Sequence, residues 1–443
     1  MSDQKLTNLI KYGFYLLIIV LPWQTRLIWR DAFLNGSIWE YGRFSLYASE
    51  IFLALWFMLY GAWLWRARRQ QHWRLNVVWQ RLRQPAIGLY WLAVGLLLAA
   101  GVSVIFSFDA DLAYTSWIRL LEAGALFSAI TVLSFDFKKI SIAWVMSAVI
   151  QSLFGIVQFF TQFSPANKWL GLAEHWPSVG GSVILQTSTE RWLRAYGSFP
   201  HPNILGGFLV IGLLCLAYLL LNSKTLQQRL MLDISLVIIA IGLFLSFSRS
   251  AWGATILTLV ALGVWTFRQH QPDWQKRFMV MAVIIVLTLV PLTAMFSELV
   301  STRMMGQEPV EVNSIQLRLT FTEQAWQLIQ NNFWTGTGVG NYTLGVYQQI
   351  NGSWPAYYYQ PVHNLYLLIL TELGVIGFGL FIILLGWLAV SLVKAPGSLE
   401  KITVGLMLAA VLFISLFDHY FWTLFSGILM FWIILGLSLK QLK

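Results

Sequence analysis

Apolar runs of about 20 residues follow one another along most of this sequence, separated by short polar segments. A helix of that length crosses a hydrocarbon core about 30 Å thick. Hydrophobic residues make up 58% of the chain and charged residues only 11%, which is typical of polytopic membrane proteins rather than soluble domains. We therefore expect an all-α polytopic membrane protein with about 12 transmembrane helices, forming one integral membrane domain over residues 1–443. The expected spans are 9–24, 46–65, 86–106, 113–133, 141–163, 201–222, 231–247, 250–267, 278–297, 362–393, 402–417 and 419–439.

Basic residues concentrate in the loops on one side of these spans. The segment between the second and third spans carries Arg66, Arg68, Arg69, Arg74, Arg81 and Arg83. Segments of this kind stay in the cytoplasm. Alternation from there places the basic segments 138–139, 224–229, 268–277, 394–401 and 440–443 on the same side. The pattern predicts two cytoplasmic termini, and it attributes the net charge of +10 to lipid headgroups, with no nucleic acid as a partner.

The longest segment outside the spans is 298–361, between the ninth and tenth, which we expect to be a large helical loop on the external side. Its centre predicts a helix that is capped near Asn313 or Ser314, runs through Ile329 and stops at 331–332. Apolar residues at 315, 319, 326 and 329 recur at helical spacing. We expect this face to lie on the membrane surface or against other spans.

Three glycines, Gly336, Gly338 and Gly340, follow this helix. A nucleotide-binding loop would need a preceding strand, a following helix and a P-loop lysine, and the sequence offers none of these here. We expect instead a tight turn that lets the backbone come close to a helix or a ligand. Motifs for metal ligands, such as His-Glu-x-x-His or paired cysteines, are also missing, so we expect no metal and no cofactor.

Four of the arginines expected on the external side are candidate ligands. Arg191 and Arg194 precede the sixth span, Arg249 lies between the seventh and eighth, and Arg318 lies on the loop helix. A guanidinium group binds phosphate oxygens in pairs and keeps its charge. Anchoring to lipid headgroups is the alternative role for each of them. Their common side indicates a site for an anion such as a phosphate ester.

His363 and Asn364 stand where the external loop meets the tenth span. An imidazole with an ordinary pKa of about 6.5 can take a proton from a hydroxyl near neutral pH, whereas a structural role is the alternative for a single interfacial histidine. Glu372 lies half a turn round the helix and about 13 Å deeper, so it does not orient His363 directly. Asp418 and His419, between the last two spans, are the second choice for an acid and base pair.

Four motifs, in this order, resemble the O-antigen ligase and O-antigen polymerase superfamily. They are Arg194 with residues 197–203, Ser248-Arg249-Ser250, Arg318 with Trp326 ahead of residues 336–341, and His363-Asn364 with Gly374. Gly377 and Phe378 stand where the ligases often have two threonines, so ligase and polymerase both stay open.

The resemblance implies glycosyl transfer at the periplasmic face of the bacterial inner membrane. The donor it implies is a glycan on undecaprenyl diphosphate, and the acceptor is a hydroxyl of a glycan or of a lipid A core. The reaction is expected to be that of an O-antigen ligase, independent of metal and inverting. A polymerase of the same superfamily is the main alternative, and a polysaccharide or lipid transporter is the other, although transporters tend to place polar groups at the membrane midplane.

Within that reaction, His363 is expected to act as the base or to orient the acceptor. A diphosphate leaving group gathers negative charge as the anomeric bond breaks, and arginines can stabilise that charge. The expected ligands of the substrates are Arg318 and Arg194 at the diphosphate, together with Arg249, Arg191, Asn203 and Asn364. Membrane lipids are the remaining expected partners.

Overall fold

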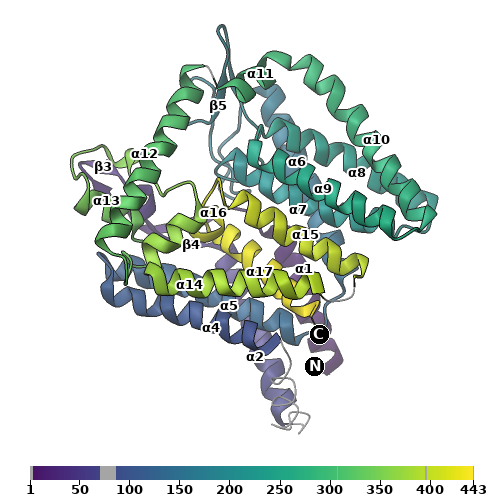
Figure 1. The fold of residues 1–443 in the computed structure, drawn as a ribbon, viewed down its shortest axis with the longest axis horizontal. Coiled ribbons are helices and arrows are strands. Elements are labelled where there is room, and N and C mark those ends of the chain that lie inside the picture. The colour runs from purple at the N-terminus through teal and green to yellow at the C-terminus, as the bar shows by residue number, and fades with distance from the viewer. Residues whose placement is uncertain (1–2, 70–85, 307, 395–396, 443) are drawn as a thin grey trace.

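The computed structural model describes residues 3–69, 86–306, 308–394 and 397–442, which form an all-α bundle with short antiparallel strand pairs (Figure 1). The helices are α1 (Asp3–Val20), α2 (Ala48–Arg69), α4 (Ala86–Ser103), α5 (Ala110–Val132), α6 (Phe137–Thr161), α7 (Pro202–Leu221), α8 (Leu226–Leu245), α9 (Arg249–Arg268), α10 (Pro272–Met295), α11 (Ser297–Met305), α12 (Pro309–Asn331), α13 (Tyr342–Gln349), α14 (Leu365–Lys394), α15 (Leu399–Ile414), α16 (Tyr420–Thr423) and α17 (Phe425–Lys440). The strands are β1 (Arg26–Arg30), β2 (Phe33–Leu34), β3 (Ser37–Ile38), β4 (Phe44–Tyr47), β5 (Ile184–Gln186) and β6 (Arg191–Leu193), and the 3-10 helices are η1 (Glu40–Gly42), η2 (Val104–Phe106) and η3 (Ala356–Tyr358). The strands pair as β1 with β4, β2 with β3 and β5 with β6.

Each of the predicted spans overlaps a helix, and the predicted all-α polytopic fold class is confirmed. Among the described residues, 8 helices are long and apolar enough to cross a membrane: α2, α4 with η2, α6, α7, α8, α9, α10 and α14. The apolar helix α17 is shorter, and α1, α5 and α15 are shorter or more polar. The last predicted span, 419–439, was wrong in its first part, because the chain forms the short helix α16 there and restarts as α17 after Leu424.

Helix starts in this bundle are fixed by side chains that accept hydrogen bonds from otherwise unpaired backbone N–H groups. Asp109 caps α5, Thr225 caps α8, Ser248 caps α9 and Ser398 caps α15. These polar residues directly precede apolar runs, which is why the span boundaries could be predicted to within a few residues.

The helix α7 forms the centre of the bundle. It is buried along nearly its whole length and packs against α6, α8, α9 and α15. Its start therefore holds a fixed position relative to the start of α9 and the end of α15, which positions the polar residues described below.

The described residues of three predicted basic segments, 138–139, 394–401 and 440–443, lie at one end of the bundle. The Nζ of Lys440 donates to the Leu133 carbonyl at 3.2 Å, and Gln441 donates to Glu400 at 2.7 Å. These contacts bring the C-terminal segment together with the α5–α6 loop and the start of α15. The shared end agrees with the predicted alternation.

A second contact joins two more of the basic loops. The Arg277 side chain at the start of α10 donates to the Leu221 carbonyl at the end of α7 at 2.6 Å. Of the six arginines predicted to fix the orientation of the chain, Arg74, Arg81 and Arg83 lie outside the described residues, whereas Arg66, Arg68 and Arg69 belong to the end of α2.

The long segment 298–361 contains α11, α12, α13 and η3. The prediction that its main helix begins near Asn313 or Ser314 was wrong, because α12 begins at Pro309. Proline is favoured in the first helical turn, where its missing N–H has no intrahelical partner to lose. The predicted end, at Asn331, is confirmed.

The predicted apolar stripe of α12 faces outward over most of its length. Ile315, Leu319 and Trp326 are exposed, whereas Ile329 is buried. The buried face of the helix is formed by Glu311, Phe321, Gln324, Ala325, Leu328 and Ile329. Most of the stripe therefore faces away from the other described spans, and its position on the membrane surface stays a prediction.

The glycine turn after α12 packs against a break in α14. Gly374 has a φ of 63° inside that helix, which leaves carbonyls of the preceding turn free. The N–H of Thr337 donates to the Thr371 carbonyl at 2.8 Å, and the N–H of Gly338 donates to the Glu372 carbonyl at 3.0 Å. A Cβ on Gly336 would lie 2.2 Å from the backbone carbonyl oxygen of Glu372. The predicted close approach of the backbone to a helix is therefore confirmed.

Candidate functional site

Polar side chains gather at the end of the bundle opposite the joined basic loops. They surround a cavity of about 330 Å³. Its walls come from the starts of α7 and α9, the end of α11, the middle of α12 and the end of α15. The lining residues are Asn203, Arg249, Ser250, Arg303, Arg318, Phe413 and Phe417.

Arg194 lies behind this cavity and is 3% exposed. Its Nε donates to the Ser246 carbonyl and its Nη2 to the Oδ1 of Asn203, both at 2.8 Å. The Nδ2 of Asn203 donates in turn to Asp418 at 3.1 Å. Burial lowers the pKa of Arg194, and the charge of Arg303 adds to this effect. The predicted pair Arg194 and Asn203 is thus brought together, with Asn203 as the member that reaches the cavity.

Arg303 was not among the predicted site residues, although it lines the cavity. It is 5% exposed, and its Nη1 donates to both carboxylate oxygens of Glu311 at 2.6 Å. Arg249 lies beside it, donating to the Arg303 carbonyl at 3.2 Å with its Nη2 3.6 Å from Glu311. One feature of the sequence could have indicated this ion pair. Arg303 and Glu311 flank a segment with Gly306 and Pro309, and a turn formed by such residues brings its two flanks together.

Arg318 lines the cavity from α12. Among the described residues, its side chain forms no hydrogen bond or ion pair, which sets it apart from Arg194, Arg249 and Arg303. Burial lowers its pKa, while the charge of Asp418 opposes that shift. A guanidinium fork in this position at the wall of a cavity is available to bind two oxygens of an anion.

His363 lies just before α14, beside α12. Its ring stacks on Phe321 at 5.9 Å between centroids, and Phe321 is on the same face of α12 as Arg318. The His419 ring lies edge-on at 5.2 Å. The Nδ1 of His363 is buried, and no described group bonds to it. Burial, with the charge of His419, lowers the pKa of His363 to about 3, so the free site holds a neutral imidazole at neutral pH.

A buried carboxylate sits among three histidines next to this ring. Burial alone raises the pKa of Asp418, but His419, His363 and His201 outweigh it, and the net shift is downward. The ring of His201 caps α7 by accepting from the N–H of Asn203 at 3.0 Å. The predicted second-choice pair, Asp418 and His419, therefore belongs to the same site as His363.

Two other predicted ligands have different surroundings. Asn364 caps α14, because its Oδ1 accepts from the N–H of Leu367 at 3.0 Å, and its Nδ2 donates to the Leu416 carbonyl at 3.2 Å. Arg191 is exposed on β6 and does not line the cavity. The structure thus brings Arg194, Asn203, Arg249, Arg318 and His363 together, while Asn364 supports the helix beside them and Arg191 lies apart.

Glu372 lies under the glycine turn and is 2% exposed. Its Oε2 accepts a hydrogen bond from the indole N–H of Trp422 on α16 at 2.8 Å. This bond agrees with the expectation that Glu372 does not orient His363. The carboxylate instead ties the broken helix α14 to the segment that follows Asp418 and His419.

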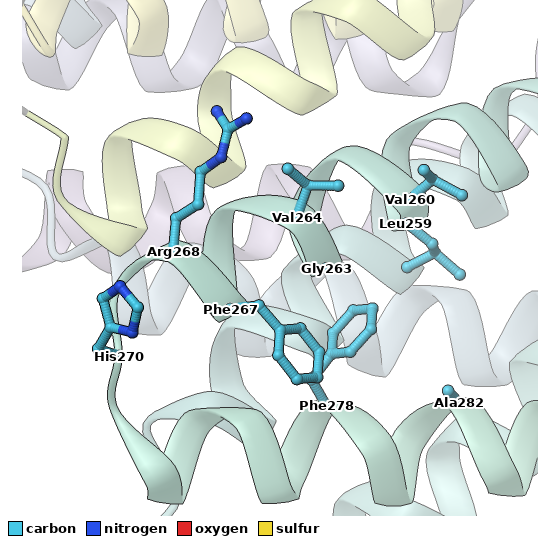
Figure 2. A pocket seen from close by; sticks show the side chains of 9 residues that line it. All are labelled: Leu259, Val260, Gly263, Val264, Phe267, Arg268, His270, Phe278 and Ala282. Atoms are coloured by element: carbon cyan, nitrogen blue, oxygen red, sulfur yellow. The ribbon is translucent and has the colours of Figure 1, made fainter.

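A larger cavity, of about 740 Å³, lies between α9 and α10 at the other end of α9. Figure 2 shows apolar side chains along its walls, with Arg268 and His270 at one end. A helix of 20 residues is about 30 Å long, so this groove is far from Arg249 at the start of α9. It lacks the converging polar groups of the smaller cavity. Within the described ranges, no three His, Cys, Asp or Glu side chains gather as metal ligands would.

Comparison with known proteins adds two findings. Residues 234–382 match the family described as O-antigen ligase. The chain is also 27% identical over 273 residues to a general O-oligosaccharyltransferase of Acinetobacter baylyi, an alignment that covers 59% of this chain and 45% of that protein. Less than half of the relative's length is therefore matched. The family match includes Arg249, Arg303, Arg318 and His363.

Proposed function

This chain is a member of the O-antigen ligase superfamily, and from that premise we propose that it is a membrane glycosyltransferase that moves a glycan from undecaprenyl diphosphate to an acceptor hydroxyl. The observation that carries the proposal is the guanidinium fork of Arg318, which has no partner among the described residues and stands at the wall of a cavity beside the neutral imidazole of His363. The relative's name, an O-oligosaccharyltransferase, supports transfer of a whole oligosaccharide to an oxygen.

The arginines suit a diphosphate leaving group. As the bond between the anomeric carbon and the bridging oxygen breaks, the electron pair passes to the diphosphate, and negative charge grows there. Arg318 and Arg249 line the cavity where this charge would lie, and Arg194 holds Asn203 at its wall. Donors that are already in place when charge develops stabilise a transition state without further reorganisation.

His363 suits the acceptor side of the same reaction. One ring nitrogen takes the proton of the acceptor hydroxyl as its oxygen attacks the anomeric carbon, and a single displacement of this kind inverts that carbon. A pKa of about 3 in the free site makes His363 a weak base before the donor binds. Negative charge nearby raises the pKa of a histidine, so a bound diphosphate moves His363 toward its working range.

The membrane supplies the place for the carrier. The exposed residues Ile315, Leu319 and Trp326 of α12 offer an apolar surface to the polyprenyl tail near the cavity. Because the basic loops favour the cytoplasm, we place the cavity and the loop 298–361 on the periplasmic side of the bacterial inner membrane. Both termini are then cytoplasmic.

The acceptor separates two forms of this function. A ligase transfers to a lipid A core or another surface acceptor, and a polymerase transfers to a second lipid-linked glycan. A gel of cell-surface glycans from a deletion strain distinguishes them. Loss of a ligase leaves no attached repeat units, whereas loss of a polymerase leaves single units attached.

The proposed activity is tested with the purified protein. It is incubated with an undecaprenyl-diphosphate oligosaccharide, candidate acceptors and a metal chelator, and the products are identified by mass spectrometry. We expect the acceptor to gain the glycan and free undecaprenyl diphosphate to form. Absence of transfer to every glycan acceptor, together with glycan-independent lipid movement in proteoliposomes, would instead favour a transporter.

A further inference from the structure

We propose that the buried ion pair of Arg303 and Glu311 positions Arg249 and Arg318 for the diphosphate, without binding the substrate's charge itself. This inference rests on the proposed function and adds two positioning residues to it. Neither residue was expected from the sequence to take part in the site.

The two members of the pair are buried. Arg303 is 5% exposed and Glu311 3%, and one guanidinium nitrogen of Arg303 donates to both oxygens of Glu311 at 2.6 Å. Its Nε donates to the Phe247 carbonyl at 2.9 Å. Phe247 has a φ of 46° in the turn before α9. The charge of Arg303 is therefore compensated inside the protein, and its hydrogen bonds fasten the end of α11 to the α8–α9 turn.

Arg249 depends on this contact. Its Nη1 donates to the backbone carbonyl of Arg303 at 3.2 Å, and its Nη2 lies 3.6 Å from the Oε2 of Glu311. Arg249 follows Ser248, which caps α9, so its backbone is fixed from one side by the helix start. Its long side chain is fixed from the other side by the Arg303 segment.

Arg318 depends on the pair through α12. Glu311 lies in the first turn of that helix, and Arg318 follows seven residues later. Seven residues correspond to about two turns, so both side chains project from the same face, about 10 Å apart along the axis. Fastening Glu311 sets the rotation of α12 about its axis, and that rotation directs the fork of Arg318 into the cavity.

A simpler role makes the opposite prediction. If Glu311 served only as a counter-charge in a cluster of arginines, its replacement by glutamine would make the site more positive. Anion binding would then become tighter. A positioning role predicts weaker binding of the diphosphate in the same variant, in spite of the added positive charge.

The test compares Glu311→Gln with the matched control Glu323→Gln, an exposed glutamate on the same helix. Binding of undecaprenyl diphosphate is measured directly, and donor KM, acceptor KM and kcat are measured in the transfer assay. We expect Glu311→Gln to weaken donor binding and raise donor KM about tenfold or more, since small misplacement of a binding group has effects of up to about a hundredfold. Acceptor KM stays within about twofold, and Glu323→Gln behaves as wild type.

A second variant separates positioning from misfolding. A buried ion pair replaced by apolar residues of similar volume often leaves stability unchanged or higher, so Arg303→Met with Glu311→Leu should unfold at a temperature near that of wild type. We expect this folded double variant to show the same raised donor KM. Wild-type donor binding in it, or equal or tighter binding in Glu311→Gln, overturns the positioning role. A wild-type protein that transfers no glycan overturns the proposed function instead.

Discussion

The two halves of the site hold their charges in opposite ways. In the arginine half, backbone carbonyls hold three guanidinium groups: Ser246 binds Arg194, Phe247 binds Arg303, and the Arg303 carbonyl binds Arg249. In the histidine half, the imidazoles contact aromatic rings and one another. The pKa of His363 is lowered to about 3 there, so its imidazole carries no charge at neutral pH.

The difference suggests a division of labour. Positive charge for the leaving group is in place before the donor arrives, because the Arg303 carbonyl fixes the direction of Arg249 and Arg318 lines the cavity from α12. The proton acceptor is kept neutral until the diphosphate supplies negative charge beside it. Changes in the arginine half should therefore act on donor binding and on chemistry, whereas changes in the histidine half should act on chemistry alone.

Replacement of His363 should have the largest effect. General bases contribute about 10²–10⁴-fold to rates, so His363→Ala should lower kcat about 10³-fold, with donor KM unchanged. The measurement is glycan transfer by purified protein at saturating donor. Thermal unfolding serves as the control for folding, and kcat within a few fold of wild type would remove His363 from the chemistry.

Arg318→Lys should have the next largest effect. Lysine keeps the charge but loses the planar fork that binds two oxygens, and loss of one preorganised donor costs about 10²–10³-fold. We expect kcat/KM for the donor to fall about 100-fold. Arg191→Lys, on the exposed strand β6, provides the comparison, and equal effects of the two substitutions would contradict the assignment of Arg318.

The pH dependence of activity should distinguish free from donor-bound protein. The profile of kcat/KM reports groups in the free enzyme, and that of kcat reports groups in the complex. Because the free-site pKa of His363 is about 3, kcat/KM should show no step from this residue near pH 6.5. The kcat profile should lose activity on acidification at a higher pH, since the diphosphate raises that pKa. If kcat and kcat/KM lost activity at the same acidic pH, the proposed shift of the His363 pKa on donor binding would be contradicted.

The folding stability of the protein should depend on pH because the pKa of His363 is lowered in the folded state. Between the folded pKa of about 3 and the ordinary value of about 6.5, the unfolded chain binds more protons at His363 than the folded chain does. Stability is therefore fully present above about pH 6.5 and falls as the pH is lowered toward 3. Thermal unfolding of His363→Gln should depend less steeply on pH across this window, and a slope equal to that of wild type would contradict the shift.

Asn364→Ala should have the smallest effect. Loss of a helix cap costs about 1 kcal/mol, and the cap of α14 lies next to His363. We expect a lower unfolding temperature and a kcat reduced several-fold, with donor binding unchanged. Ser398→Ala removes the cap of α15 at the other end of the bundle and should lower stability alone. An unchanged kcat in Asn364→Ala would show that the histidine half tolerates movement of this helix start.

The sequence predicted the helices well, because runs such as 202–221 are long, apolar and bounded by polar caps. It also predicted that Arg194, Asn203, Arg249, Arg318 and His363 share one site, since each stands outside or at the end of a span on the same side. Helical periodicity does not report contacts between separate elements. The pairing of Arg303 with Glu311 depends on how the chain turns at Gly306, whose φ is 64°, and this was missed.

The break in α14 was missed for a related reason. Gly374 lies inside the predicted span 362–393, which is apolar enough overall for hydropathy to predict an unbroken helix there. The break is stabilised by the N–H groups of Thr337 and Gly338, which bond to carbonyls of the preceding turn. Such pairing between distant segments has no periodic signal in the chain.

The division between the two halves is tested most directly by the binding of undecaprenyl diphosphate, without a glycan, to the purified protein. Wild type, His363→Ala and Arg318→Ala are compared by equilibrium binding in the same detergent. The account predicts that His363→Ala binds as tightly as wild type, and that Arg318→Ala binds at least about tenfold more weakly, since hydrogen bonds between charged groups are worth about 1.5–3 kcal/mol. Equal weakening in both variants, or tight binding by Arg318→Ala, would contradict it.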